Sequence, residues 1–100
     1  MVRYDDDWVI LVDDLNYMPC RDLHRMTSVK QKDGTEKEVP EYGRPLGYYT
    51  EFDAALRGIM KKNFNDAVKD REVSLAEALR IIQEERRKAE AVLKQFRMEI

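Results

Sequence analysis

The sequence contains few of the residues that form disulfides, interrupt helices and strands, or bind metal ions. Its 100 residues include one cysteine, one histidine, three prolines and four glycines. The single cysteine excludes an internal disulfide and fits the reducing cytoplasm, where we expect the protein to act. One cysteine and one histidine are too few for a zinc site of ordinary composition. The glycines are scattered, so the chain has no glycine-rich phosphate-binding loop.

Long apolar runs are also missing. No stretch approaches the roughly 18 apolar residues of a membrane-spanning helix, and three consecutive aspartates, Asp5 to Asp7, follow closely on the initial methionine. We therefore expect neither a membrane span nor a signal peptide.

Catalytic and metal-binding patterns are weak. Cys20 and His24 are four residues apart, but their segment contains Pro19 and is typical of a strand or loop, where this spacing separates the side chains. The aspartates near the N-terminus lack the order of acids and the central glycine of a calcium-binding loop. We predict that the protein is not an enzyme and holds no metal or cofactor.

Charged residues are abundant instead. They make up 38% of the chain, compared with about 25% in an average protein, which is typical of solvated helix faces or of a surface that meets another macromolecule. The net charge is −2 and the pI about 5.5. Residues 1–22 carry six acids and two bases. Because this acidic segment would repel phosphates, it weakens the case for nucleic-acid binding.

The first half of the chain has the pattern of strands and turns. The apolar run 8–12 predicts a buried strand, and residues 13–16, Asp-Asp-Leu-Asn, predict a turn. Residues 17–26 predict a second strand that lies at a sheet edge or begins after Pro19, because proline cannot donate to a ladder. The Asp33-Gly34 pair predicts a hairpin that projects into solvent. Residues 40–47, with two prolines and two glycines, are interpreted as a connector.

The second half predicts two helices, over about residues 51–69 and 75–97. Thr50 with Asp53, and Ser74 with Glu77, have the spacing of a capping box at each start. The connection between the helices is short enough to make them antiparallel neighbours. The first helix has one apolar face, made of Phe52, Ala55, Leu56, Ile59, Met60 and Ala67, with Phe64 at its edge.

The second helix carries an apolar stripe at heptad spacing. Arg86 is the one charge on it, and Ile81 and Val92 lie beside it. Ile81 and Val92, with Phe96 and Met98 near the end of the chain, either broaden the core stripe, which we favour, or are left for a partner. The stripe consists of Leu75, Leu79, Ile82, Arg86, Ala89, Leu93 and Phe96.

Tyr48 and Tyr49, just before the first helix, admit two interpretations. As strand residues they point to opposite faces, one into the core and one to the surface. A stacking platform for bases needs its aromatics on one exposed face among basic residues, and only Arg44 is near in the sequence. We favour the strand interpretation.

Several of these features together resemble small phage- and prophage-encoded proteins of unknown function. They are the tryptophan-containing strand that ends at Asp13, the nearby Tyr17, the run 47–50 that leads into residues 52–56, and the start of the second helix at residues 74–78. The resemblance supplies no catalytic residues. It implies an accessory protein of a phage or mobile element, of the kind that acts by binding a host protein.

Residues 1–100 thus predict a single α+β domain. A small antiparallel sheet of about three strands, within residues 1–49, is followed by a two-helix antiparallel hairpin. We expect a non-enzymatic protein-binding factor in the host cytoplasm, and prefer anti-CRISPR-like inhibition of a nuclease or another defence or nucleic-acid-processing protein. Its carboxylates can mimic phosphates on a basic groove. The partner-binding residues would be Asp5, Asp6, Asp7, Asp13 and Asp14.

Three alternatives remain open. The acids could simply keep the edge of a strand soluble. The protein could bind nucleic acid through the basic residues of the first helix, or it could be a self-associating module that forms a homodimer through its C-terminal helix. The basic residues concerned are Arg57, Lys61, Lys62 and Lys69.

Overall fold

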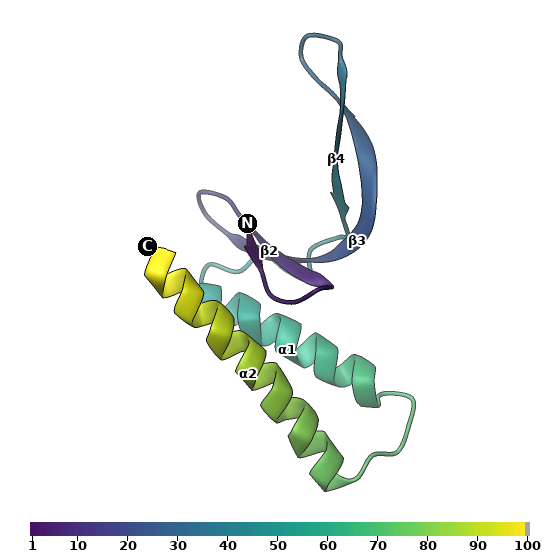
Figure 1. Cartoon of the computed structure of the whole chain (residues 1–100), viewed down its shortest axis with the longest axis vertical. Coiled ribbons are helices and arrows are strands. Elements are labelled where there is room, and N and C mark those ends of the chain that lie inside the picture. The colour runs from purple at the N-terminus through teal and green to yellow at the C-terminus, as the bar shows by residue number, and fades with distance from the viewer. Residues whose placement is uncertain (100) are drawn as a thin grey trace.

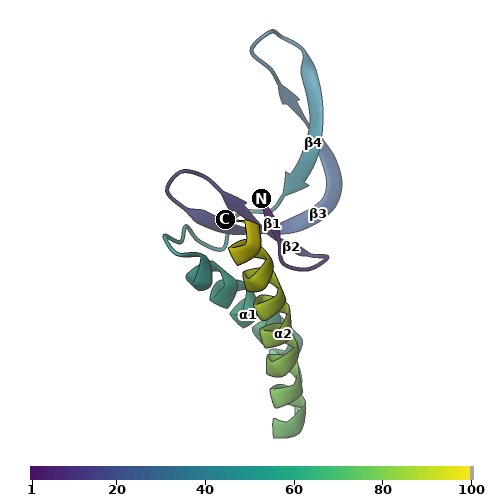
Figure 2. The same ribbon diagram turned by 60° about the vertical axis from the view of Figure 1, so that its left-hand side comes forward.

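The computed structural model describes residues 1–99, and the side chains of residues 1–97. Four strands form one antiparallel sheet in the order β1-β2-β3-β4, and two helices pack against one face of its β1–β2 end (Figures 1 and 2). The predicted α+β class is confirmed, with four strands in place of about three. The elements are β1 (Val2–Arg3), β2 (Trp8–Val12), β3 (Tyr17–Lys30), β4 (Glu36–Tyr42), α1 (Phe52–Val68) and α2 (Leu75–Glu99).

The predicted buried strand and its turn are confirmed in β2. Trp8, Val9 and Ile10 are buried, because β2 lies inside the sheet with the helices over it. The turn that follows is held by Asp13, whose Oδ1 accepts the backbone N–H groups of Leu15 and Asn16 at 2.8 and 2.7 Å.

The second strand differs from the prediction. β3 begins at Tyr17, before Pro19, and it is an inner strand. Pro19 lies opposite Ile10 of β2, but its carbonyl accepts the N–H of Leu46 at 2.9 Å. The backbone of Pro19 therefore faces the irregular segment after β4. The missing N–H removes no bond between β2 and β3, so the proline is tolerated inside the strand.

Beyond Asp22, β3 leaves the body of the molecule and pairs only with β4. We call residues 23–42 the arm. Between Asp22 and Met26 the register shifts, so that residues 23–25 lie opposite Glu41 alone. His24 takes a left-handed φ of 56° within this bulge. A bulge bends the strand that carries it, and β3 turns sharply here, so that the arm projects away from the helices (Figure 1).

The predicted hairpin forms the tip of the arm. Gln31 N–H donates to Thr35 O at 2.7 Å, and Gly34 supplies the positive φ of 86° that the turn requires. Residues 30–38 are all exposed, as predicted for a hairpin that projects into solvent. The expected connector is shorter than residues 40–47, because Pro40 is paired with Met26 inside β4.

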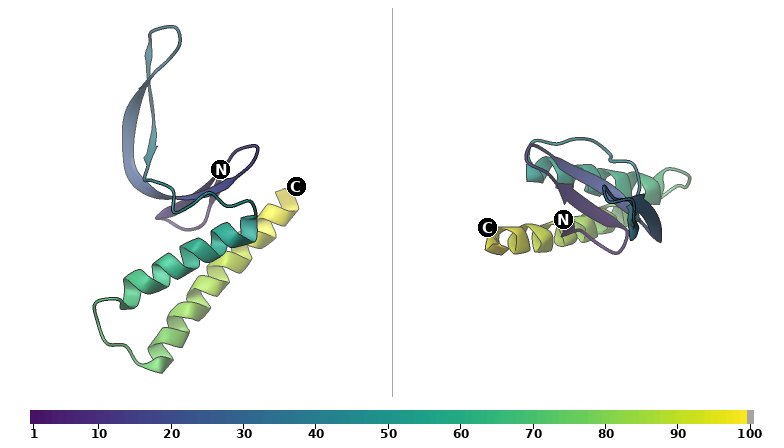
Figure 3. Two further views of the ribbon diagram at one scale, coloured as in Figure 1. Left: turned by 180° about the vertical axis from the view of Figure 1, so that it is seen from behind. Right: turned by 90° about the horizontal axis from the view of Figure 1, so that it is seen from above.

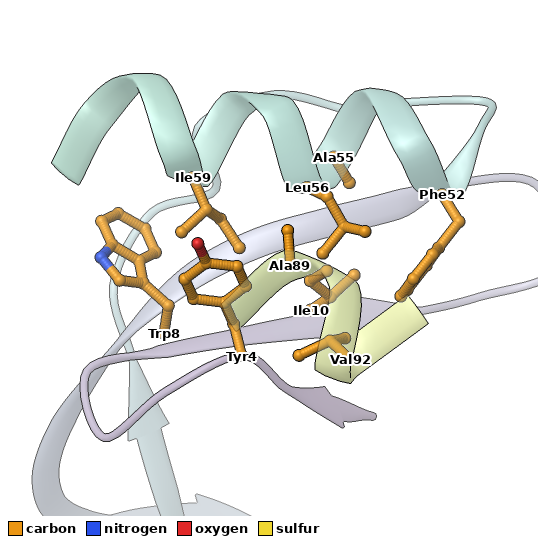
Figure 4. Close-up of a cluster of buried hydrophobic side chains, with 9 residues drawn as sticks. All are labelled: Tyr4, Trp8, Ile10, Phe52, Ala55, Leu56, Ile59, Ala89 and Val92. Atoms are coloured by element: carbon orange, nitrogen blue, oxygen red, sulfur yellow. The ribbon is translucent and has the colours of Figure 1, made fainter. Parts of the chain in front are cut away.

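The hydrophobic core lies between the sheet and the two helices. Phe52, Leu56 and Ile59 project from α1 towards Ile10 of β2 (Figure 4). From α2, Ala89 and Val92 complete the cluster. These positions confirm the predicted apolar face of the first helix.

Of the two predicted N-terminal caps, the one at α1 is absent and the one at α2 is present. Glu51, one residue after the predicted Thr50, is the N-cap of α1, and no side chain caps that helix, so the Thr50–Asp53 capping box is wrong. At α2 the prediction is confirmed for the serine: Ser74 Oγ accepts the N–H of Glu77 at 3.1 Å. The Glu77 carboxylate binds Arg71 at 3.0 Å.

The buried line of α2 is rotated from the predicted stripe. Glu85, Ala89 and Val92 are buried, whereas Leu75 and Leu79 are 77% and 49% exposed. Val92 thus belongs to the core, as the broader-stripe interpretation held, and the side chain of Met98 lies outside the described residues. The helices are antiparallel, as predicted, and separate towards their connecting loop (Figure 3). No helix within residues 1–99 has the length and apolarity needed to cross a membrane.

Candidate protein-binding surfaces

The predicted acidic cluster is divided between the two ends of β2. Asp5, Asp6 and Asp7 precede the strand, and Asp13 and Asp14 follow it. The five residues of β2 separate the two groups by roughly 17 Å, at about 3.3 Å per residue. The structure therefore does not bring the five carboxylates into one patch.

Asp5 has a structural role in this group. Its Oδ1 accepts the N–H groups of Asp7 and Trp8, both at 2.9 Å, and fixes the turn between β1 and β2. Its Oδ2 lies 3.3 Å from the ammonium of Lys88 on α2. Asp13 likewise organises its own turn. Asp6 and Asp14 are exposed, and neither carboxylate makes a hydrogen bond or ion pair within the described residues, although the charge of Asp6 acts on Arg3.

Asp7 lies at the base of the arm. Its carboxylate is 3.3 Å from His24 Nε2, and its backbone carbonyl accepts the N–H of Asp22 at 2.8 Å. Asp22 in turn binds Arg3 at 2.8 Å and caps the N–H of His24. The Arg3 guanidinium lowers the pKa of the Asp22 carboxyl, chiefly through this hydrogen bond. These contacts fix the bulge from which the arm projects.

A buried polar network joins the sheet to both helices. Glu85 is only 6% exposed, and its Oε1 accepts Tyr4 Oη at 2.9 Å and Asn63 Nδ2 at 2.7 Å. Its Oε2 pairs with Lys88 Nζ at 3.0 Å. Asn63 also accepts the indole N–H of Trp8 at 2.9 Å. Burial, followed by the hydrogen bond to Glu85, raises the pKa of the Tyr4 hydroxyl.

The polar side chains of this network bind one another and join the β1–β2 segment to α1 and α2. Within the described residues, no buried side-chain nitrogen or oxygen lacks a hydrogen-bond partner, and no cluster of His, Cys, Asp and Glu could hold a metal. Sequence reasoning missed the network because Glu85 lies in a run of charged residues that resembles a solvated face. Cys20, the other buried reactive group, pairs with Val9 inside the sheet, and burial raises the pKa of its thiol.

The basic residues of α1 are partly neutralised. Asp66 lies 3.0 Å from Lys62, 3.6 Å from Lys69 and 3.4 Å from Arg21. Arg57 borders a groove between the helices, and Lys61 lies beside Lys62 next to Leu46 and Tyr49. Two of the four predicted nucleic-acid contacts thus share one carboxylate, which reduces their attraction for phosphate.

Tyr48 and Tyr49 point to opposite sides, as strand residues do. Tyr49 pairs with Tyr17 of β3 and packs against the core, while Tyr48 is exposed. The Tyr49 ring lies over Gly58 of α1, where an added Cβ would be 2.8 Å from the tyrosine hydroxyl oxygen. The two rings do not form a common stacking surface.

The arm has two edges with different chemistry. Gln31 and Thr35 form a hydrogen-bonded pair. Because bonded and non-bonded pairs alternate along an antiparallel ladder, the backbone groups of Met26, Ser28 and Lys30 in β3 point away from β4. On β4 the outward positions include Pro40, which has no N–H to offer. The edge of β3 over residues 26–30 is therefore the open one, and Met26 beside it is about half exposed.

No protein-family model matches this chain, and comparisons with curated proteins and with solved structures also gave no match.

Proposed function

We propose that this chain is a non-enzymatic protein-binding factor that captures an extended segment of a partner along the edge of β3 in the arm. The observation that carries the proposal is the arm itself. Residues 24–38 contribute no side chain to the core, and nearly all of them are exposed. A two-stranded ribbon gains little stability by itself in water, so its extension beyond the body favours a role in contact with another molecule.

The open edge defines the mode of binding. An added strand would accept and donate main-chain hydrogen bonds at Met26, Ser28 and Lys30, the positions whose backbone faces outward. Val29 and Val39 lie on one face of the ribbon and offer an apolar contact beside that strand. Asp6 and Asp7, at the base of the arm, would favour a partner with basic residues near the bound segment.

The resemblance to phage accessory proteins supports a host protein as the partner. Capture of a segment from a nuclease or another defence protein would inhibit it by occupying a surface that it needs. The alternative, nucleic-acid binding through α1, has less support because Asp66 pairs with Lys62 and Lys69.

A proline substitution on the open edge tests the proposal. Ser28 directs its N–H away from β4, so Ser28→Pro removes an outward donor while the bonded pairs of the arm remain. Ser28→Ala is the matched control. From a bacterial lysate, the wild-type chain and Ser28→Ala should recover the same protein, and Ser28→Pro should lose it. Equal recovery by all three chains would show that this edge does not bind the partner.

A further inference from the structure

The open edge of the arm lies on the side of β3 that β2 covers in the body. β2 pairs with β3 as far as Trp8 and Arg21, and Asp7 O then accepts the N–H of Asp22 at 2.8 Å. The residues before Asp7 form the turn from β1, so β3 enters the arm with a neighbour only at its β4 side (Figure 1). Ser28, whose backbone groups point away from β4, therefore faces the position that a continuation of β2 would occupy.

The end of this edge nearest the body is acidic. The side chain of Asp7 is 62% exposed, and His24 Nε2 lies 3.3 Å from its carboxylate. Asp6 is exposed beside it, and its carboxylate has no ion pair within the described residues. The nearby cations Arg3 and Arg25 each bind a carboxylate of β3 or β4. A strand added along the edge would therefore meet unbalanced negative charge at its body end.

The end of the edge at the tip of the arm is basic. Lys30 and Lys32 are exposed, and neither ammonium forms an ion pair within the described residues, although Lys30 is opposite Glu36 in the ladder. Glu36 and Glu38 lie on β4, and the Asp33 carboxylate is bound within the turn by backbone and side-chain donors. A strand beside β3 would therefore be next to the two lysines, with β3 between it and the glutamates.

We propose that the segment captured at this edge runs antiparallel to β3, with acidic residues first and basic residues last. This inference rests on the proposed function and adds the charge order of the partner. β3 runs from the body to the tip, so an antiparallel strand begins beside the lysines of the tip and ends beside Asp6 and Asp7. Antiparallel pairing is the more stable arrangement, and it continues the direction of β2.

The two ends of the edge act independently on a bound strand. From His24 to Lys30 the strand extends by roughly 20 Å, at about 3.3 Å per residue. This separation exceeds the Debye length of about 8 Å at physiological ionic strength. Each end therefore selects the charge of the partner residues nearest to it, and a segment with the opposite charge order is repelled at both ends.

Two synthetic peptides of identical composition test the charge order. Glu-Glu-Val-Thr-Val-Thr-Val-Lys-Lys has the proposed order, and Lys-Lys-Val-Thr-Val-Thr-Val-Glu-Glu is the reversed control. In an NMR titration of the full chain, the first peptide should shift the amide signals of Met26, Ser28 and Lys30 and bind with a Kd about tenfold lower than that of the second. The difference should shrink at high salt. Equal affinities, tighter binding of the reversed peptide, or no shift with either would overturn the proposal.

Neutralising the lysines tests where the preference arises. Lys30→Gln combined with Lys32→Gln should reduce the ratio of the two Kd values to about threefold, because only the acidic end then discriminates. Lys37→Gln, an exposed position on β4, is the matched control and should leave the ratio unchanged. An unchanged ratio in the double variant would contradict the proposal.

Failure of this inference is distinct from failure of the proposed function. Equal affinities of the two peptides, together with loss of lysate capture by Ser28→Pro, would refute the charge order and leave the edge of β3 as the binding site. Unchanged lysate capture by Ser28→Pro would refute the proposed function itself.

Discussion

Glu84 and Glu85 are adjacent in α2 but have opposite surroundings. The Glu84 carboxylate is exposed and pairs with Arg87 on the same helix. The Glu85 carboxylate is buried and joins Tyr4, Asn63 and Lys88. A buried charge costs free energy unless it is paired and hydrogen-bonded, and here each oxygen of the Glu85 carboxylate has a donor. Removal of this carboxylate would take an acceptor from Tyr4, Asn63 and Lys88 together.

We therefore predict different costs for the two glutamates. Glu85→Ala should lower the free energy of unfolding by about 3 kcal/mol, because Tyr4 and Asn63 lose their shorter acceptor and Lys88 loses one of its two carboxylate partners inside the fold. Glu84→Ala should change it by no more than about 0.5 kcal/mol. Urea denaturation of the two variants measures the difference. Equal small effects would mean that the network contributes little to stability.

At the scale of single residues, the sequence predicted apolar positions better than polar roles. Ile10, Phe52 and Ile59 were expected in the core because their spacing matches a strand and a helix. Asp5 and Glu85 were not recognised as structural, since an acid in a charged run has the same pattern whether it is solvated or buried. Their partners, Lys88 and Tyr4, are distant in the sequence, so only tertiary contacts identify them.

At the scale of elements, the bulge in β3 decides the shape of the sheet. The first half of β3 pairs with β2 in the body, and its second half pairs with β4 in the arm. Two ion pairs border the bend: Arg3 with Asp22, and Arg25 with Glu41. Each arginine, through its hydrogen bond, lowers the pKa of its carboxyl partner.

This linkage predicts that acid loosens the base of the arm. A carboxyl whose pKa is lowered in the folded state adds stability above its ordinary pKa, and that stability is lost as the pH falls through the lowered value. The ordinary values here are 3.8 for Asp22 and 4.5 for Glu41. When the pH is lowered from 7 to 3, the amide protection factors at residues 22–25 should therefore fall relative to those of the β2 amides. Protection factors that change in parallel in the two segments would contradict the linkage.

The elements themselves were largely predictable, and their bends and rotations were not. The Asp33-Gly34 turn and both helices follow from local turn and periodicity signals. The bulge at His24 has no local signal, because a left-handed φ is uncommon at any residue other than glycine. The rotation of α2 places Glu85 rather than Arg86 in the interior, and it follows from contacts with Tyr4 and Asn63 that no helical pattern contains.

At the scale of the whole molecule, the shape is elongated, with principal extents of 56 × 33 × 19 Å. The arm projects from the sheet in one direction, and the open end of the helix hairpin extends in the other (Figure 1). The core lies between them, so the proposed binding edge of the arm is separate from the contacts that hold the fold together.

The central claim is that the arm serves binding and contributes little to folding, and its excision tests this most directly. Thr27 and Val39 lie opposite each other as one of the hydrogen-bonded pairs of the arm. A two-residue Asn-Gly turn closes a hairpin at a pair of this kind. Residues 28–38 would be replaced by Asn-Gly, and thermal unfolding and partner capture measured on the same sample. The account predicts a melting temperature within about 4 °C of the wild type and complete loss of capture. Unfolding of the shortened chain, or capture at the wild-type level, would contradict it.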